Sequence, residues 1–197
     1  MANSKTDRNH RAAEREIVRQ EVAAACKTES RIADVFARAL ESILEHLADS
    51  ASIDLVEDDG TIARAITRHT DSRMEEVLAK YRSEHPLPLT ASYGYPRVIK
   101  TGKAQFIPGV NDRIGSRLFS PAGSEFEAQL VVDGISVRSF ICVPLVARGR
   151  VLGALTVLTT GKNRLLMSDD LLLFEELAEL LGETLDAELR RHSRGTP

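Results

Sequence analysis

The hydrophobic pattern is clearest in the C-terminal half, where two apolar runs cover residues 139–146 and 151–158. Only the basic turn Arg148-Gly149-Arg150 separates the runs. Short apolar runs joined by a turn predict two paired strands, and apolar residues at successive positions predict burial of both faces. A sheet covered on each face by one helical layer leaves room for an enclosed ligand.

Helical periodicity marks both ends of the chain. Residues 12–47 contain no Gly or Pro, and their apolar side chains recur at helical spacing, which predicts one long helix. Ser168 or Asp169 is expected to cap a final helix that runs to about Arg191. The first half of the long helix is only thinly apolar, so it either pairs with another helix or remains a solvated extension.

The middle of the chain alternates turns with short elements. Asp58-Asp59-Gly60 lies between two strand-like runs and predicts a hairpin. Asp71 or Ser72 is expected to cap a helix, and a shorter helix has Pro96 in its first turn and Gly102 beyond its end. A strand at 104–107, a long loop at 108–123 and a helix at 125–132 should follow, and so long a loop is typical of a lid or binding loop.

Because the strands come mainly as hairpins, without regular βαβ alternation, the sequence predicts the α+β class with a central antiparallel sheet. The expected division is a disordered tail at residues 1–11, a helical extension at 12–33, one domain at 34–190 and a tail at 191–197.

Composition narrows the functional classes. The 197 residues carry a formal net charge of -3, with 43% hydrophobic and 28% charged residues, so nothing favours nucleic acid or an anionic membrane. No apolar run is long enough to span a bilayer and the N-terminus lacks a signal-peptide core, which predicts a cytoplasmic protein. Cys26 and Cys142 have no Cys or His neighbour at metal-ligand spacing, so no metal site is expected.

Several segments together resemble the GAF domain, the small-molecule-binding module of bacterial signalling proteins such as sensor histidine kinases and sigma-factor-regulating phosphatases. The likeness covers about residues 34–190, and its best match is 134–145, followed by 149–155 and 168–178; residues 53–60, 69–71 and 98–103 match earlier in the chain. It implies a PAS-related sheet with the terminal helices on one face, often in a dimer bundle. The other face would carry a pocket roofed by the middle helices and the long loop.

The chemistry of special GAF subfamilies is not supported by the residues. Cys142 has no adjacent His for a bilin and is the one cysteine in the pocket region, whereas sulfoxide reductases of this family use several. The order Lys162-Asn163 reverses a cyclic-nucleotide signature. His69 more plausibly takes part in helix capping, and His85 in a solvated helix end, than in binding haem. The cofactor is therefore unknown, with no bilin, haem or metal signature.

The expected pocket combines apolar walls with a few polar groups that orient a ligand. The asparagine and the two arginines would suit a carboxylate or phosphate. The alternative is that the apolar residues fill one another's space. The candidate ligand-binding residues are Tyr93, Val98, Ile107, Asn111, Arg113, Ile114, Arg117, Phe119, Phe126, Leu130, Ser139 and Ile141.

The sequence thus predicts a non-catalytic sensory domain of two-component type. It would bind a small molecule or a kinase or phosphatase partner, and act through the terminal helices of a homodimer. The alternatives are a structural dimerisation or interaction module without ligand, and an enzyme of the methionine-sulfoxide-reductase type.

Overall fold

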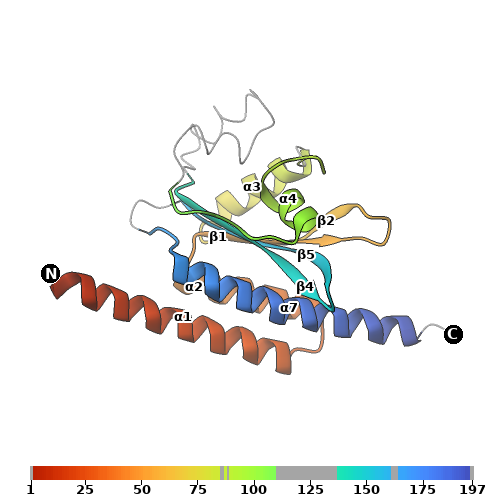
Figure 1. Ribbon diagram of the computed structural model, residues 1–197, viewed down its shortest axis with the longest axis horizontal. Coiled ribbons are helices and arrows are strands. Elements are labelled where there is room, and N and C mark those ends of the chain that lie inside the picture. Colours follow the sequence, from red (N-terminus) through yellow and green to blue (C-terminus); the bar gives the residue numbers. More distant parts are fainter. Residues whose placement is uncertain (1, 85–86, 88, 110–136, 161–163, 196–197) are drawn as a thin grey trace.

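A computed structural model describes residues 2–84, 87, 89–109, 137–160 and 164–195. The described chain has a five-stranded sheet with α2 and α7 on one face and α3 and α4 on the other, and α1 packs on the outer side of α2 and α7 (Figure 1). The predicted α+β class with a central antiparallel sheet is confirmed. The helices are α1 (Ala2–Thr28), α2 (Ile32–His46), α3 (Ser72–Glu84), α4 (Gly94–Thr101) and α7 (Ser168–Gly195), and the strands are β1 (Ser50–Val56), β2 (Ile62–His69), β3 (Gln105–Ile107), β4 (Ser139–Ala147) and β5 (Arg150–Thr159).

The strand order is β2-β1-β5-β4-β3, and every neighbouring pair is antiparallel. The predicted hairpin of β4 and β5 is present. Ala147 pairs with Arg150, so Arg148 and Gly149 form a two-residue loop with φ angles of 52° and 74°. Positive φ at both positions is the requirement of a type I′ turn, which glycine meets without strain and arginine does not. Arg148 also forms an ion pair with Asp186 of α7, with 3.2 Å between Nε and Oδ2, which ties the turn to the helix.

The long N-terminal helix predicted for residues 12–47 is in fact two helices that break at residues 29–31. They run antiparallel, since Ser42 Oγ of α2 donates to Glu21 Oε2 of α1 at 2.6 Å. The first backbone N–H of α2, at Ile32, donates to Glu188 Oε2 of α7 at 2.8 Å. The start of α2 has no capping side chain of its own, and the carboxylate of Glu188, distant in the sequence, accepts a hydrogen bond from its free backbone N–H instead.

Helix α1 begins at Ala2, so residues 2–11 are helical where the sequence predicted a disordered tail. Its apolar stripe packs inside the same chain, because Val18 and Val22 are fully buried in the core cluster with α2 and α7. Arg15 and Arg19 pair with Asp170 and Glu176, which sets α1 parallel to α7. These contacts cover the stripe that had suggested a partner helix.

Helix α7 lies unusually close to β4. A Cβ atom on Gly182 would stand 2.6 Å from the carbonyl oxygen of Val146 and 2.8 Å from its nitrogen. Only glycine allows this approach, so α7 contacts the backbone of the strand directly. No helix in the described part of the chain has the length and apolarity that a membrane crossing requires.

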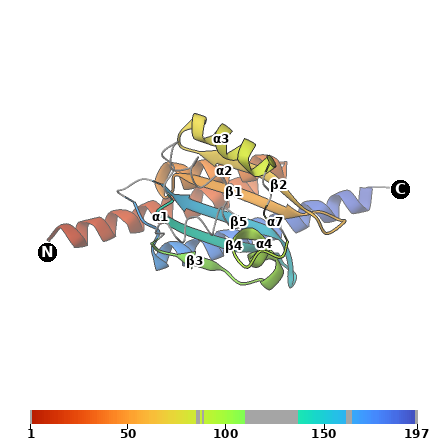
Figure 2. The same cartoon turned by 90° about the horizontal axis from the view of Figure 1, so that it is seen from above.

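On the opposite face α3 lies beside β2, and α4 lies over β4 and β5 (Figure 2). Asp71 caps α3 as predicted, with its Oδ1 accepting the Arg73 N–H at 2.9 Å. Helix α4 ends as predicted at Gly102, which has a φ of 63° and donates its N–H to the carbonyl of Val98. Most of the predicted loop at 108–123 and all of the helix at 125–132 lie outside the described residues.

Candidate ligand-binding face

The two faces of the sheet differ in chemistry. Side chains alternate along a strand, so Ile141, Val143 and Leu145 of β4 point to the terminal helices while Phe140 and Cys142 point to α3 and α4. The face under the terminal helices also takes Ala51 and Ile53 of β1 and is apolar except at one end, where Ser139 and Thr159 are buried. The face under α3 and α4 buries polar side chains, namely Ser50, Ser52, Asp54 and Thr156.

Three of these polar residues form a continuous floor. Ser52 pairs with Thr156 across β1 and β5, and Asp54 lies two positions further along β1. Thr156 Oγ1 donates to Cys142 Sγ at 3.3 Å, which extends the floor to β4. The sequence interpretation of Cys142 as a buried residue agrees with its full burial here. The floor therefore joins a carboxylate, two hydroxyls and a thiol.

A buried ion pair stands at one end of the floor. Asp54 Oδ1 lies 2.7 Å from Arg64 Nε, and the Asp54 side chain is only 3% exposed. The guanidinium carbon of Arg64 lies 5.6 Å from the ring centroid of Tyr95, which adds a cation–π contact from α4. A buried ion pair is weak evidence of stability, because apolar replacement is often neutral or stabilising by roughly 1–4 kcal/mol.

A β-bulge produces this pairing. The register of β1 and β2 shifts between Ile53 and Asp54, so Ile53 opposes Ile66 while Asp54 opposes Arg64. The extra residue on β2 turns Ile66 to the terminal helices and Arg64 to α4. Simple alternation along 62–68 predicts Ile62 and Ile66 on one face and Arg64 on the other, but the bulge puts Ile62 and Arg64 together on the face under α3 and α4.

Helix α4 forms part of the roof. Its residue Tyr95 is 7% exposed, and the Tyr95 hydroxyl accepts the Leu87 N–H at 3.2 Å. Tyr93 immediately precedes the helix, and burial raises the pKa of its hydroxyl above the usual value. Gly94 has a φ of 67° and donates its N–H to Gln105 Oε1 at 2.8 Å, which joins the roof to β3.

Arg97 adds a donor to the same helix. Its Nη1 atom is buried, and within the described ranges no hydrogen bond reaches that atom. A buried guanidinium nitrogen without an acceptor costs free energy, so this atom is a candidate donor to a bound group. The sequence analysis did not single out Arg97.

The structure brings together only some of the predicted site residues. Tyr93, Val98 and Ile107 belong to the apolar cluster under α3 and α4. Ser139 and Ile141, predicted to form the pocket floor, face the terminal helices instead: Ile141 packs in their core, and Ser139 Oγ accepts the Leu166 N–H at 2.8 Å. The predicted residues outside the described ranges are Asn111, Arg113, Ile114, Arg117, Phe119, Phe126 and Leu130.

The residues around this face that sequence reasoning missed are Ser52, Asp54 and Thr156 of the floor, Arg64 at its end and Tyr95 of the roof. One signal was available for two of them. Ser50, Ser52 and Asp54 alternate with apolar residues along β1, and the neighbouring strand β5 is mainly apolar. Such alternation within a buried sheet marks a polar face.

His69 takes part in capping, as the sequence suggested, because its Nδ1 accepts the Asp71 N–H at 2.9 Å where β2 leads into α3. Its Nε2 is buried, and no residue of the described part of the chain forms a hydrogen bond with it. Burial lowers the pKa of His69 below its usual value of 6.5, against the opposing effect of Asp49, Asp71 and Glu75. Within the described residues no group of three or more His, Cys, Asp or Glu side chains could hold a metal ion.

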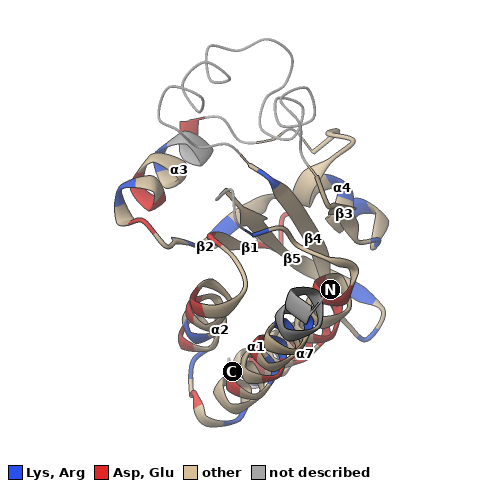
Figure 3. Cartoon of the chain, turned by 90° about the vertical axis from the view of Figure 1, so that its left-hand side faces the viewer, with Lys and Arg blue, Asp and Glu red and all other residues tan. Residues whose placement is uncertain are grey.

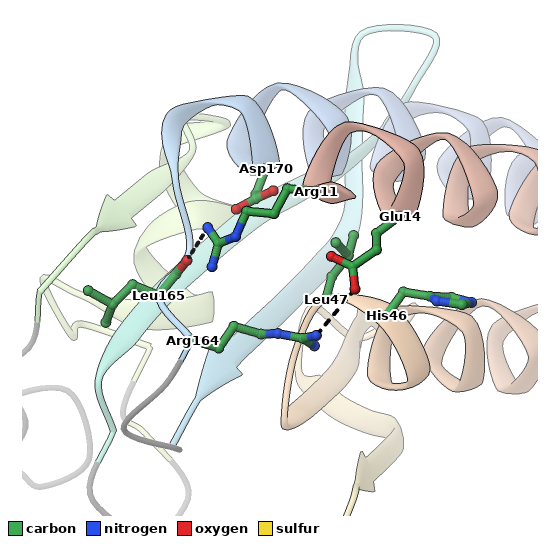
Figure 4. Close-up of a pocket in the computed structure, with 7 residues that line it drawn as sticks. All are labelled: Arg11, Glu14, His46, Leu47, Arg164, Leu165 and Asp170. Atoms are coloured by element: carbon green, nitrogen blue, oxygen red, sulfur yellow. Dashed lines mark hydrogen bonds and ion pairs between the residues drawn. The ribbon is translucent and has the colours of Figure 1, made fainter. Parts of the chain in front are cut away.

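A small hollow lies elsewhere, between α1 and the start of α7 (Figure 4). Arg11 Nη1 donates to the Leu165 carbonyl at 3.0 Å, and Arg164 pairs with Glu14 at 3.6 Å between Nη2 and Oε1. Its volume of about 10 Å³ suits one water molecule at most. This polar junction fastens α1 to α7 and is too small for a metabolite.

A model of the GAF domain family matches residues 31–185. The chain belongs to the GAF domain family. The resemblance proposed from the sequence is thus confirmed. No curated protein matches this GAF domain in sequence.

Solved structures share the fold at low sequence identity. The GAF domain of a phosphoenolpyruvate-protein phosphotransferase from Coxiella burnetii has a TM-score of 0.66 and 14% identity, over 92% of this chain and 98% of its own. Free methionine-R-sulfoxide reductase from Neisseria meningitidis, solved with its substrate, has a TM-score of 0.61 and 19% identity, over 92% and 93%. A segment of a methyl-accepting chemotaxis protein has a TM-score of 0.61 and 13% identity, over 89% and 99%. This GAF domain therefore has both signalling proteins and a reductase among its structural neighbours.

Proposed function

We propose that this protein is a non-catalytic sensory GAF domain that binds a small polar molecule on the face covered by α3 and α4. The observation that carries the proposal is the contrast between the two sheet faces. The sheet face under the terminal helices is apolar apart from two hydroxyls at one end, Ser139 and Thr159, whereas the other face buries a charged pair, Asp54–Arg64, together with two hydroxyls. Apolar walls with a few convergent polar groups are typical of small-molecule sites.

Arg97 and the floor suggest the nature of the ligand. The buried Nη1 of Arg97 needs an acceptor, and a carboxylate or phosphate oxygen is the strongest one available. We therefore expect an anionic or strongly hydrogen-bond-accepting metabolite, held between α4 and the floor.

The proposed output is the position of α7. Two contacts support this route, both between the sheet and the helix: the close approach at Gly182 and the ion pair of Asp186 with the turn at Arg148. A ligand that shifts β4 would move α7 with it, because the backbone of Val146 touches the helix. The kinase or phosphatase partner that would read this movement remains part of the proposal, as does a cytoplasmic location.

A thermal-shift screen of the purified chain against nucleotides, amino acids and carboxylates tests the binding proposal. At least one compound should raise the melting temperature of the wild type. The same compound should leave the Arg97→Gln variant unshifted while it still stabilises Arg38→Gln, a control at an exposed arginine of α2. Equal shifts in the wild type and Arg97→Gln would exclude Arg97 from the site, and an absence of shifts across the panel would oppose ligand binding.

The reductase among the neighbours calls for a test of the non-catalytic assignment. Cys142 is fully buried, and Cys26 lies on the terminal-helix side, where burial raises the pKa of its thiol. Both settings disfavour the thiolate that redox chemistry requires. Incubation with free methionine-R-sulfoxide and dithiothreitol should give no reduction above the protein-free rate. Turnover that disappears in Cys142→Ser would contradict the proposal.

The homodimer also remains a proposal, now on different grounds. With the stripe of α1 covered, the apolar side chains left on the outer helices are Ile17, Leu172 and Leu189, exposed by 41%, 65% and 46%. Light scattering coupled to gel filtration should give twice the chain mass. The mass of a single chain would favour signalling within a monomer.

A further inference from the structure

A second hollow lies at the edge of the sheet, away from the polar floor. It has a volume of about 210 Å³ and lies where β4 runs on beyond β3, because β3 pairs only with residues 140–142. Ala104, Pro144 and Val146 give it an apolar floor, and all three are half-buried. Glu175 and Glu179 of α7 form one wall.

The wall carries an uncompensated negative charge. Glu175 and Glu179 are exposed and one helical turn apart, and Glu183 follows one turn later, a spacing that puts the three on the same side of α7. Figure 3 colours the acidic residues of the chain red. Like charges at this spacing destabilise a helix. The neighbouring Glu176 pairs with Arg19, but none of the other three glutamates forms an ion pair with any described residue. Within the described chain, these three charges therefore contribute no ion pair that would stabilise the fold.

We propose that this hollow docks an arginine side chain from a basic segment of a partner protein. The three methylenes of arginine would lie on the floor formed by Ala104, Pro144 and Val146. The planar guanidinium would then lie between the carboxylates of Glu175 and Glu179, where its fork of donors can bond both. Leu172, 65% exposed and one turn before Glu175, offers an apolar contact beside the anchor.

Arginine fits this hollow better than other occupants. A purely apolar side chain would leave two carboxylates partly desolvated without a partner, which costs free energy. A carboxylate or phosphate would be repelled by the wall. Lys103 lies between the lining residues Gly102 and Ala104 but forms no ion pair with either glutamate. Among the described residues, no Lys or Arg side chain therefore neutralises the two carboxylates in place of the incoming arginine. Arginine anchors of this kind are frequent among the dominant residues of protein interfaces.

A two-dimensional NMR titration of the full chain tests the proposal with a defined probe, N-acetyl-arginine N-methylamide. The neutral isostere N-acetyl-citrulline N-methylamide serves as the matched probe, since it keeps the shape and loses the charge. The arginine probe should shift the backbone amides of Ala104, Val146 and Glu179, and the citrulline probe should not. The shifts should weaken as salt is raised. Equal shifts from both probes, or arginine shifts confined to other parts of the chain, would overturn the proposal.

The double variant Glu175→Gln/Glu179→Gln separates a docking role from a structural one. It should weaken binding of the arginine probe by roughly tenfold or more, as expected for lost charge-assisted hydrogen bonds. It should also melt at a higher temperature than the wild type, because the repulsion within α7 is removed. The control Glu45→Gln/Glu57→Gln changes two exposed glutamates elsewhere and should bind the probe like the wild type. A double variant that binds normally, or that melts at a lower temperature, would refute the assignment.

Discussion

The contact of α7 with β4 makes Gly182 the most informative single position for stability. Replacing glycine by alanine inside a helix ordinarily stabilises it by about 1 kcal/mol. Here the new Cβ would meet the oxygen and nitrogen of Val146 at 2.6 and 2.8 Å, and both are backbone atoms of a strand paired with β5. They cannot rotate away as a side chain can, so α7 must move off the sheet. The clash with Val146 therefore opposes the stabilisation that the higher helix propensity of alanine would give.

The size of the effect follows from these two terms. Overpacking of a filled interior costs about 1–3 kcal/mol, and a clash with backbone belongs at the upper end of that range. After the gain of about 1 kcal/mol in helix propensity, Gly182→Ala should lose about 2 kcal/mol of unfolding free energy. For a chain of this size the loss corresponds to a fall in melting temperature of about 4–8 °C.

Urea unfolding followed by circular dichroism measures this difference. Glu183→Ala, at the next and exposed residue of α7, is the matched control and should stay within about 0.5 kcal/mol of the wild type. If Gly182→Ala proved as stable as the wild type or more so, helix propensity would dominate. The close approach of α7 to β4, and with it the proposed route from sheet to helix, would then be refuted.

Two further predictions concern the terminal helices and the junction of β2 with α3. Val22 of α1 is fully buried against the neighbouring helices, so Val22→Ala should lower the free energy of unfolding by about 1–3 kcal/mol in urea unfolding. Ile17→Ala, at an exposed position of the same helix, should cost well under that. Equal small effects of the two substitutions would mean that α1 does not pack on its own domain. Burial lowers the pKa of His69 in the folded chain below its unfolded value of 6.5, so the unfolded state takes up the proton first and stability should fall as pH drops from about 7.5 to about 5.5. His69→Gln should flatten this fall, and identical pH profiles for variant and wild type would rule out His69 as its source.

Local signals in the sequence predicted the turns and helix ends correctly. Asp58-Asp59-Gly60 and Arg148-Gly149 form the expected hairpins, and Gly102 ends α4 in the left-handed conformation. In each case glycine supplies a positive φ at a fixed point in the chain, so the cause and its consequence are neighbours in sequence. Asp71 caps α3 for the same local reason.

Features that depend on distant residues were missed. The break at residues 29–31 has no Gly or Pro, and the new helix start is satisfied by Glu188, more than 150 positions away. Ser139 and Ile141 were expected to line the pocket, but they face the terminal helices. Because β4 is apolar on both faces, alternation alone does not show which of its side chains point to the terminal helices and which to α3 and α4. The bulge at Ile53 and Asp54 reversed the phase of β2 in the same way. Contacts between residues far apart in the sequence decided all three, and the sequence does not display them.

Native mass spectrometry of the full chain purified from cells tests the sensory assignment most directly. The proposal predicts that the wild type carries a bound small molecule, released on denaturation, and that Arg97→Gln carries less of it while Arg38→Gln carries as much. A bare wild-type chain that stays bare after exposure to a cell metabolite extract would contradict the account. The buried polar face under α3 and α4 would then be structural, and the protein an interaction module.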